Sequence, residues 1–369
     1  MTTHHSIAVV GGGLGGLTLA RVLHVNGIEA AVYDRDASRD ARAQGGMLDI
    51  HEESGQAALR AAGLYEEFRR RVLPGGEALR ILDRHGTVHW EEADEGDGTR
   101  PEIDRGDLRD LLLDSLPAGT VRWGAKAESV RTLPDGRHAV TLADGSSFTA
   151  DLLVGADGAW SVVRPLLSSA RPAYAGISFV EGDLPDADTR HPRGAEVVGG
   201  GMLFALDDGK GFLAHRESDG SLHVYTALRI PENAFPPPQA DALLPHFNDW
   251  SPALTSLLTD SEGPLTPRPI HVLPTNHHWP RVPGVTLLGD AAHLMSPFAG
   301  EGANLALQDA AELAQSLAAH PSDVETALAA YEAPLFPRSE AAARESAATL
   351  ELCFGEGAAR RLAEQFACL

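Results

Sequence analysis

Runs of apolar residues and helical stretches alternate over the first forty residues. Residues 7–10 are a short apolar run with β-branched side chains, which predicts a buried strand. Residues 17–23 are typical of a helix, which Asn26 and Gly27 end, and residues 30–33 predict a second strand. We therefore expect the chain to begin with a strand, a helix and a second strand.

A strand followed by a helix is predicted at two further places along the chain. Residues 148–154 predict a strand that leads through a short turn into a helix. Residues 285–288 predict a buried strand that precedes a long helix rich in alanine and leucine. Between about 170 and 270 the segments alternate instead, as in residues 221–228, which is typical of an antiparallel sheet with one wet face. Residues 241–258 predict a helical piece within that region.

These changes of pattern predict an α/β chain of about two domains, in keeping with roughly 150 residues per domain. The first is a discontinuous, Rossmann-like domain, and the second is built on the antiparallel sheet. One long helix is expected at the C-terminus. The predicted segments are 1–72, 101–168 and 271–333 for the first domain, 73–100 and 169–270 for the second, and 334–369 for the helix.

The net charge of the chain argues against binding to nucleic acids or anionic membranes. Thirty basic and 52 acidic residues give a formal net charge of −22, whereas nucleic acids and anionic membranes both attract a positive surface. No apolar run approaches the roughly 18 residues that a membrane span needs. The two cysteines, Cys353 and Cys368, are too few for a disulfide framework or a four-cysteine zinc site. We therefore expect a cytoplasmic protein with no bound metal.

A glycine-rich turn follows the first strand. Residues 11–16 read Gly-Gly-Gly-Leu-Gly-Gly and fit the G-x-G-x-x-G pattern. Gly11 would allow the tight turn, Gly13 the close approach of a pyrophosphate, and Gly16 the packing of helix on strand. Asp34 lies 23 residues after Gly11, where an acid can hold a ribose hydroxyl. This context favours a dinucleotide site over a structural turn but does not distinguish FAD from NAD.

Two segments in the middle of the chain add candidate phosphate contacts. Arg109 lies near the start of a predicted helix, where its positive charge opposes the helix dipole. A bound anion would explain this arginine, and a salt bridge to Asp110 or Asp114 is the alternative. After the next long strand, residues 155–158 (Gly-Ala-Asp-Gly, with Asp157) form either a second loop near the phosphates or a plain turn.

A third motif follows the strand predicted over residues 285–288. Asp290 stands at its end, where a carboxylate can accept hydrogen bonds from ribitol or ribose hydroxyls. Residues 297–302 form a turn of small residues whose backbone could touch a flat ring. The start of the next helix favours negative charge, which suits the N1–C2=O edge of a reduced flavin. His293 is expected to be structural.

Taken together, these motifs resemble the three fingerprints of the class A flavoprotein monooxygenases, the single-component aromatic hydroxylases related to para-hydroxybenzoate hydroxylase. The residues that carry the resemblance are Gly11–Gly16 with Asp34, Gly155–Gly158 with Arg164, and Gly289-Asp290 with Pro297 and Gly300–Gly302. A closer similarity, over about residues 5 to 350, is to the TetX-like tetracycline destructases. It rests on residues 43–51, 54–56, 104–109 and 289–304.

The resemblance implies a fold and a set of cofactor contacts. The fold would be a Rossmann-like FAD-binding domain of the para-hydroxybenzoate hydroxylase type, an antiparallel substrate domain and a C-terminal helix that braces both, in a monomer. Arg42 would help to recognise NADPH. The residues implied to contact FAD, with those of the fingerprints, are Gly11, Gly13, Gly16, Asp34, Arg35, Asp49, Arg109, Asp157, Asp290, Pro297, Gly300 and Gly302.

The resemblance also implies a reaction. NADPH or NADH would reduce FAD, O2 would give a C4a-hydroperoxide, and an electron-rich carbon of a phenol or enol would take the distal oxygen. His223 matches a substrate-contacting histidine of the destructases, whereas Glu181 and Met202 replace a glutamine and an arginine. His223 and Glu181 are therefore the candidates for the base that deprotonates the substrate.

The substrate expected from the resemblance is a tetracycline or another aromatic polyketide. Two alternatives remain open within the same fold. One is a flavin reductase or halogenase that inserts no oxygen, although the Trp-x-Trp-x-Ile-Pro signature of the halogenases is missing from the sequence. The other is a flavoprotein that binds a ligand without converting it.

Overall fold

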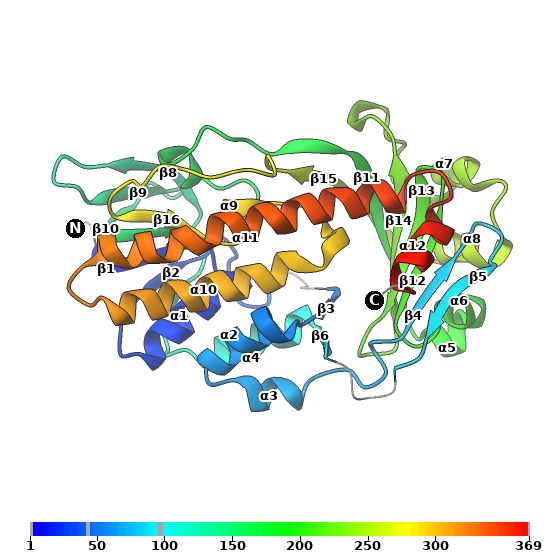
Figure 1. Cartoon of the computed structure of the whole chain (residues 1–369), viewed down its shortest axis with the longest axis horizontal. Coiled ribbons are helices and arrows are strands. Elements are labelled where there is room, and N and C mark those ends of the chain that lie inside the picture. The colour runs from blue at the N-terminus through cyan, green and yellow to red at the C-terminus, as the bar shows by residue number, and fades with distance from the viewer. Residues whose placement is uncertain (1–2, 42–44, 95–98, 368–369) are drawn as a thin grey trace.

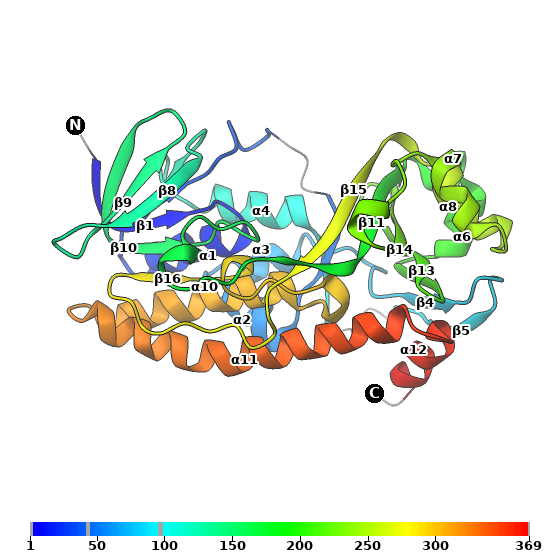
Figure 2. The ribbon, with the colours of Figure 1, turned by 90° about the horizontal axis from the view of Figure 1, so that it is seen from above.

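Two large sheets lie side by side along the long axis of the molecule (Figure 1). The computed structural model describes residues 3–41, 45–94 and 99–367. The sheet that carries the N-terminus occupies one end, and the helices α10 and α11 run together beneath it (Figure 2). From there α11 continues toward the second sheet.

The first sheet is built on the parallel strands that the apolar runs predict. β1 (Thr3–Val10) lies between β2 (Ala31–Tyr33) and β10 (Ser147–Gly155), and β16 (Val285–Leu287) pairs with β10. All four strands are parallel, and their inner residues are buried on both faces. The remaining strands are β7 (Val121–Arg122), β8 (Ala127–Thr132) and β9 (His138–Leu142), in the order β7-β2-β1-β10-β9-β8.

Helices and one small strand pair complete this half. α1 (Leu14–Val25) packs against α10 (Glu301–Ala319), and both contribute to one large hydrophobic core. β3 (Met47–Asp49) and β6 (Glu102–Asp104) form the separate antiparallel pair. The other helical elements of this half are α2 (Ala57–Ala61), α3 (Tyr65–Arg69), α4 (Arg105–Asp114), α9 (Asp290–His293) and the short turns Glu52–Gln56, Arg164–Leu166 and Pro297–Ala299.

The second sheet is antiparallel except where β4 meets β12. Its order is β15-β11-β14-β13-β12-β4-β5. The long strands β11 and β15 reach back toward the first sheet (Figure 2). The strands are β4 (Leu79–Leu82), β5 (Val88–Glu92), β11 (Ala173–Leu184), β12 (Met202–Asp207), β13 (Lys210–Arg216), β14 (Leu222–Arg229) and β15 (Glu262–Val272).

Both faces of the second sheet are covered, but by different partners. Val180 and Val224 point toward a cluster that includes residues of the small helices on the outer side. Phe179 alternates to the opposite face and packs with Leu350 and Phe354 of the C-terminal region. The outer helical elements are α5 (Ala187–Arg190), α6 (Pro192–Val198), α7 (Ala240–Leu243), α8 (Pro252–Thr259) and the turns Glu232–Ala234 and Leu244–Phe247.

The C-terminal region differs from the single helix predicted over 334–369. α11 spans Val324–Cys353 and begins ten residues earlier than predicted, with the Asp323 side chain as its N-cap. Pro334, the first residue of the predicted helix, lies inside α11. The helix then stops, and α12 (Ala358–Phe366) forms after Gly357, whose φ is +64°.

Two other local predictions were wrong. The strand at residues 147–155 does not lead into a helix, because only the short turn Arg164–Leu166 forms there. The helical piece expected over 241–258 is broken into three parts, since Pro245 and Pro252 interrupt the helical hydrogen bonds. Within the described residues, no helix is long and apolar enough to cross a membrane. The boundaries expected for the two domains stay predictions.

Candidate active site

The glycine-rich turn joins β1 to α1 with almost no room to spare. Gly11 has φ +110°, and a β-carbon there would lie 2.2 Å from the Ala156 carbonyl oxygen. A β-carbon on Gly16 would lie 2.0 Å from the carbonyl oxygen of Gly11. Gly13 is different, because a β-carbon there would meet no atom within 4 Å. Two glycines therefore permit protein packing, and the third opens the helix N-terminus to a ligand.

Asp34 ends β2 directly beside this turn. Its carboxylate is buried and accepts hydrogen bonds from the backbone N–H of Gly12 at 2.6 Å and of Asp36 at 2.7 Å. Each carboxylate oxygen keeps a further lone pair that could accept from a hydroxyl. Arg35 follows and is exposed. The predicted ribose contact is therefore compatible with the fold.

Arg109 lies buried on α4, and its side chain does not make the salt bridge proposed as the alternative. Asp110 and Asp114 instead bind Arg39, at 2.7 and 2.9 Å. One Arg109 nitrogen donates to the Arg39 carbonyl oxygen at 2.8 Å, and Asp36 lies 3.9 Å from the other, Nη2. Among the described residues, this buried Nη2 has no hydrogen-bond partner. A buried cationic N–H group without a hydrogen-bond partner suits a bound anion.

The second loop lies against the glycine-rich turn and is held there by Arg164. The N–H of Ala156 donates to the Val10 carbonyl oxygen at 2.8 Å. Asp157 accepts from the N–H of Val162 at 2.7 Å, and burial raises the pKa of its carboxyl. The Arg164 guanidinium is buried and donates to carbonyl oxygens of both the second and the third motif. These are Gly158, Ala159, Asp290 and Ala291, at 2.7 to 3.4 Å.

Asp290 and His293, both of the third motif, have different surroundings. Asp290 is exposed, at the start of α9. His293 is buried, and its Nε2 is hydrogen-bonded to Asp309 at 2.6 Å. Asp309 also accepts from Arg338 of α11 at 2.9 Å. The arrangement gives His293 the structural role expected from the sequence.

Asn304 connects the turn at 297–302 to the strand β3. Its side chain donates to the backbone carbonyl oxygens of Asp49 and Gly300, at 2.9 and 3.1 Å, and accepts from the N–H of His51 at 2.9 Å. Gly300 has φ +66°, and a β-carbon there would lie 3.2 Å from the Asp49 carboxylate. The structure thus brings Asp49 and the Gly300 turn together at the start of α10.

His51 lies between the carboxylates of Asp49 and Glu301 and forms an ion pair with each when it is protonated. Burial alone would lower its pKa, but hydrogen bonds with Asp49 and Glu301 raise it to about 9. A β-carbon on Gly302, one residue beyond Glu301, would meet open space. Pro297 at the other end of the turn is exposed. The backbone of this turn is therefore accessible to a flat ring.

The glycine-rich turn, Asp34, Arg109 and the turn at 297–302 fit FAD. Gly13 and Gly302 each leave open space beside a helix N-terminus, and the buried Arg109 Nη2 has no hydrogen-bond partner among the described residues. Helix N-termini favour the pyrophosphate and the electron-rich edge of a reduced flavin. Arg42, predicted to recognise NADPH, lies outside the described residues.

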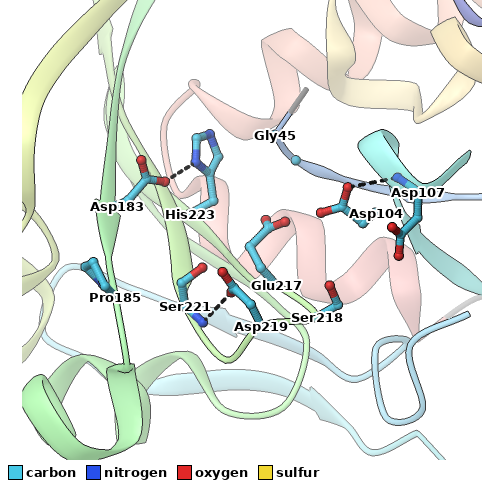
Figure 3. A pocket seen from close by; sticks show the side chains of 11 residues that line it. Gly45, Asp104, Asp107, Asp183, Pro185, Glu217, Ser218, Asp219, Ser221 and His223 are labelled. Atoms are coloured by element: carbon cyan, nitrogen blue, oxygen red, sulfur yellow. Dashed lines mark hydrogen bonds and ion pairs between the residues drawn. The ribbon is translucent and has the colours of Figure 1, made fainter. Parts of the chain in front are cut away.

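A cavity of about 440 Å³ lies where the loops of the first half meet the second sheet (Figure 3). This volume is typical of a small-molecule site. The residues that line the cavity are Gly45, Gly46, Asp104, Asp107, Asp183, Pro185, Glu217, Ser218, Asp219, Ser221 and His223. Sequence reasoning identified only His223 among the ionisable groups of this set.

His223 and Glu181 have different surroundings. His223 on β14 stands opposite Asp183 on β11, and its Nδ1 lies 2.6 Å from Asp183 Oδ1. Burial lowers the pKa of His223, but the hydrogen bond to Asp183 more than offsets this, and the net pKa is raised. Glu181 instead accepts from Arg268 at 2.7 Å and is not among the lining residues, nor is Met202. The geometry favours His223.

No metal centre competes with this interpretation within the described residues. They contain no group of three or more histidine, cysteine, aspartate and glutamate side chains that could hold a metal ion.

Comparison with known proteins identifies the family. The family described as FAD binding domain matches residues 4–240 and 249–346. The monooxygenase penA of Penicillium thymicola is 30% identical over 98% of both chains. This chain belongs to the class A FAD-dependent aromatic monooxygenases.

Solved structures agree with the fold of this monooxygenase. HpxO of Klebsiella pneumoniae, complexed with FAD and uric acid, has a TM-score of 0.80 at 23% identity, covering 99% of this chain and 91% of that one. The tetracycline destructase Tet(51) has a TM-score of 0.75 at 22% identity, covering 99% and 94%. At these identities the similarity shows the fold alone, so the substrate must be argued from the cavity.

Proposed function

We propose that this monooxygenase uses NAD(P)H and O2 to hydroxylate a phenolic or enolic polycyclic small molecule, such as a tetracycline or another aromatic polyketide. NAD(P)H supplies two electrons. One oxygen atom enters a C–H bond of the substrate, and the other leaves as water with two protons. The observation that carries the proposal is the cavity that places the His223–Asp183 pair beside the loops of the FAD-binding half.

We propose that the three motifs hold FAD, which would supply electron transfer and oxygen activation when bound. The N-terminus of α1, open at Gly13, and the Arg109 guanidinium would bind the pyrophosphate. Asp34 and Asp290 would accept from hydroxyl groups. The other proposed contacts are Gly11, Gly16, Arg35, Asp49, Asp157, Pro297, Gly300 and Gly302.

His223 would accept the proton of the substrate hydroxyl group. When its Nδ1–H donates to Asp183, Nε2 is the atom that accepts a proton from a substrate hydroxyl. A phenolate or enolate is more electron-rich than the neutral form, so deprotonation activates the carbon ortho or para to it. Asp183 would orient the ring and stabilise the imidazolium that forms. Glu181 remains a weaker candidate, because Arg268 already binds its carboxylate.

Coupled turnover tests this function. NADPH and NADH consumption by the FAD-loaded protein would be followed with and without tetracycline, and the products would be analysed by mass spectrometry. We expect faster oxidation together with a product that contains one added oxygen atom. Oxidation without oxygenation of any phenol would favour a reductase of the same fold. Retention of the ligand without either reaction would favour a non-catalytic flavoprotein.

We also propose a monomer in the cytoplasm. Cys353 is buried and makes no disulfide within the described part of the chain, which is compatible with a reducing compartment. The choice between NADPH and NADH is left to the same turnover assay.

A further inference from the structure

Glu217 is an ionisable residue of the cavity to which the proposed reaction assigns no role. It directly follows β13, at the start of the turn that leads into β14, and its N–H donates to the Ser221 carbonyl oxygen at 2.9 Å. Alternation along the strand places it on the same side as His215. Its side chain points into the space between His223 and Asp104 (Figure 3).

The Glu217 carboxylate is buried but incompletely paired. The residue is only 9% exposed, and its Oε1 has no hydrogen-bond partner among the described residues. A buried carboxylate without a partner is costly, and native proteins keep such a group chiefly where a ligand or water satisfies it. Glu217 is therefore a ready acceptor at the wall of the cavity.

Three of the other acids that line the cavity have part of their hydrogen-bonding capacity in use. Asp104 caps α4 and accepts from the N–H of Gly106 at 2.6 Å. Asp183 holds His223, and Asp219 accepts from the N–H of Ser221 at 2.9 Å. All of them nevertheless add negative potential around Glu217. Among the described residues, those that line the cavity include no lysine or arginine, and His223 is their one basic side chain.

We infer that Glu217 and the surrounding acids form a subsite for a protonated amine of the substrate, so that the substrate is a phenol or enol that also carries a basic nitrogen. This rests on the proposed function. An ammonium group would satisfy the free Oε1 and reduce the repulsion among the carboxylates. A benzoate-type substrate would instead bring a further negative charge into the cavity.

The balance of charge supports the same assignment. Burial raises the pKa of Glu217 to about 7, with His215 and His223 acting in the opposite direction and Asp104 and Asp219 in the same one. A cation beside Glu217 would favour its ionised form. Glu217 would therefore be fully ionised and paired only when the amine is bound.

Two matched pairs of phenols test the inference. Tetracycline, which carries a protonated dimethylamino group, is compared with its analogue that lacks this group. Tyramine is compared with 3-(4-hydroxyphenyl)propanoate, which carries a carboxylate instead. Binding to the oxidised, FAD-loaded protein is titrated through the change in flavin absorbance, which requires no turnover.

We expect the wild-type protein to bind the amine member of a pair at least about tenfold more tightly, or ~1.4 kcal/mol. Glu217→Gln keeps the shape of the side chain and should remove most of that preference. Glu128→Gln, on the exposed side of β8, is the matched control and should retain it. FAD content and circular dichroism of each variant report whether it is folded.

Equal or better binding of the amine-free or acidic member would overturn the inference, as would failure of both amines to bind. An unchanged preference in Glu217→Gln would overturn it as well. The proposed function fails differently, namely if no phenol in the panel gains an oxygen atom during NAD(P)H oxidation. Hydroxylation of the acidic phenol without the amine preference would retain the function and reject the subsite.

Discussion

The two parts of the candidate active site differ in which atoms shape them, backbone in one and side chains in the other. The proposed FAD site is shaped by backbone: a β-carbon on Gly11 or Gly16 would meet a carbonyl oxygen, and Arg164 binds the carbonyls of two loops. The cavity on the second sheet is shaped by ionisable side chains such as Glu217 and His223. A site built from closely packed backbone tolerates few substitutions, whereas side chains on a sheet can change one at a time. Cofactor use should therefore persist while the substrate changes.

The glycine-rich turn provides the largest expected effect. Gly16→Ala places a β-carbon 2.0 Å from the Gly11 carbonyl oxygen, so the helix must shift. We expect a loss of about 3 kcal/mol in the free energy of unfolding and purification without FAD. Gly13→Ala is the control, because its β-carbon meets no protein atom within 4 Å. It should leave apoprotein stability unchanged and weaken FAD binding. Denaturant unfolding and flavin content measure both, and equal destabilisation would contradict this distinction.

Removal of the proposed base tests the cavity. His223→Ala should slow oxygen insertion by about 10²- to 10³-fold, a typical contribution of general base catalysis, while FAD stays bound. Asp183→Asn keeps the imidazole and should have the smaller effect. Rapid mixing of reduced protein with O2 and substrate, followed by product analysis, measures the step. Unchanged product formation in His223→Ala would remove the histidine from the reaction.

Glu217 predicts a dependence of stability on pH. Its pKa is about 7 in the folded protein against an ordinary value of 4.5, so the folded state binds the proton more tightly than the unfolded one. Stability should therefore fall as pH rises from about 4.5 to 7, by at most about 3 kcal/mol. Glu217→Gln should remove that loss. Urea unfolding at pH 5 and pH 8 measures it, with Glu128→Gln as control. An identical pH dependence in Glu217→Gln and wild type would refute this.

The smallest effect is expected at Glu181. Its ion pair with Arg268 is partly exposed, because the arginine side chain is 58% accessible. Such pairs are worth about 0 to 1 kcal/mol. Glu181→Gln should change unfolding free energy by less than that and leave hydroxylation within about threefold. If turnover fell as far as in His223→Ala, Glu181 would be the better candidate for the base.

The same contrast explains how much of the site was predictable. Glycines that a turn requires and acids at strand ends are visible as motifs, so the region of Gly11, Asp34 and Asp290 could be located from the sequence. Glu217 carries no motif. Its proximity to His223 depends on the register of β13 with β14, in which His215 stands opposite His223. The one signal available in the sequence was that Glu217, two residues beyond His215, falls on the same side of the strand.

The ends of the helices were also difficult to predict from the sequence. Pro334 was interpreted as a helix start, but tertiary packing carries α11 through both of its prolines. The actual N-cap, Asp323, has only a local signal that many aspartates share. The role of Arg164 was also missed, because its carbonyl partners come from two loops that are far apart in sequence.

The helix α11 has a consequence for how the protein melts. Its 30 residues extend about 45 Å. Leu328 and Tyr331 belong to the core under the first sheet, whereas Leu350 and Cys353 belong to the core of the second. The same helix is therefore packed into both hydrophobic cores. If one half unfolded, the part of α11 that packs on the other half would lose its support, and apolar surface of that half would become exposed. Calorimetry should record a single cooperative transition in which both halves lose their structure together.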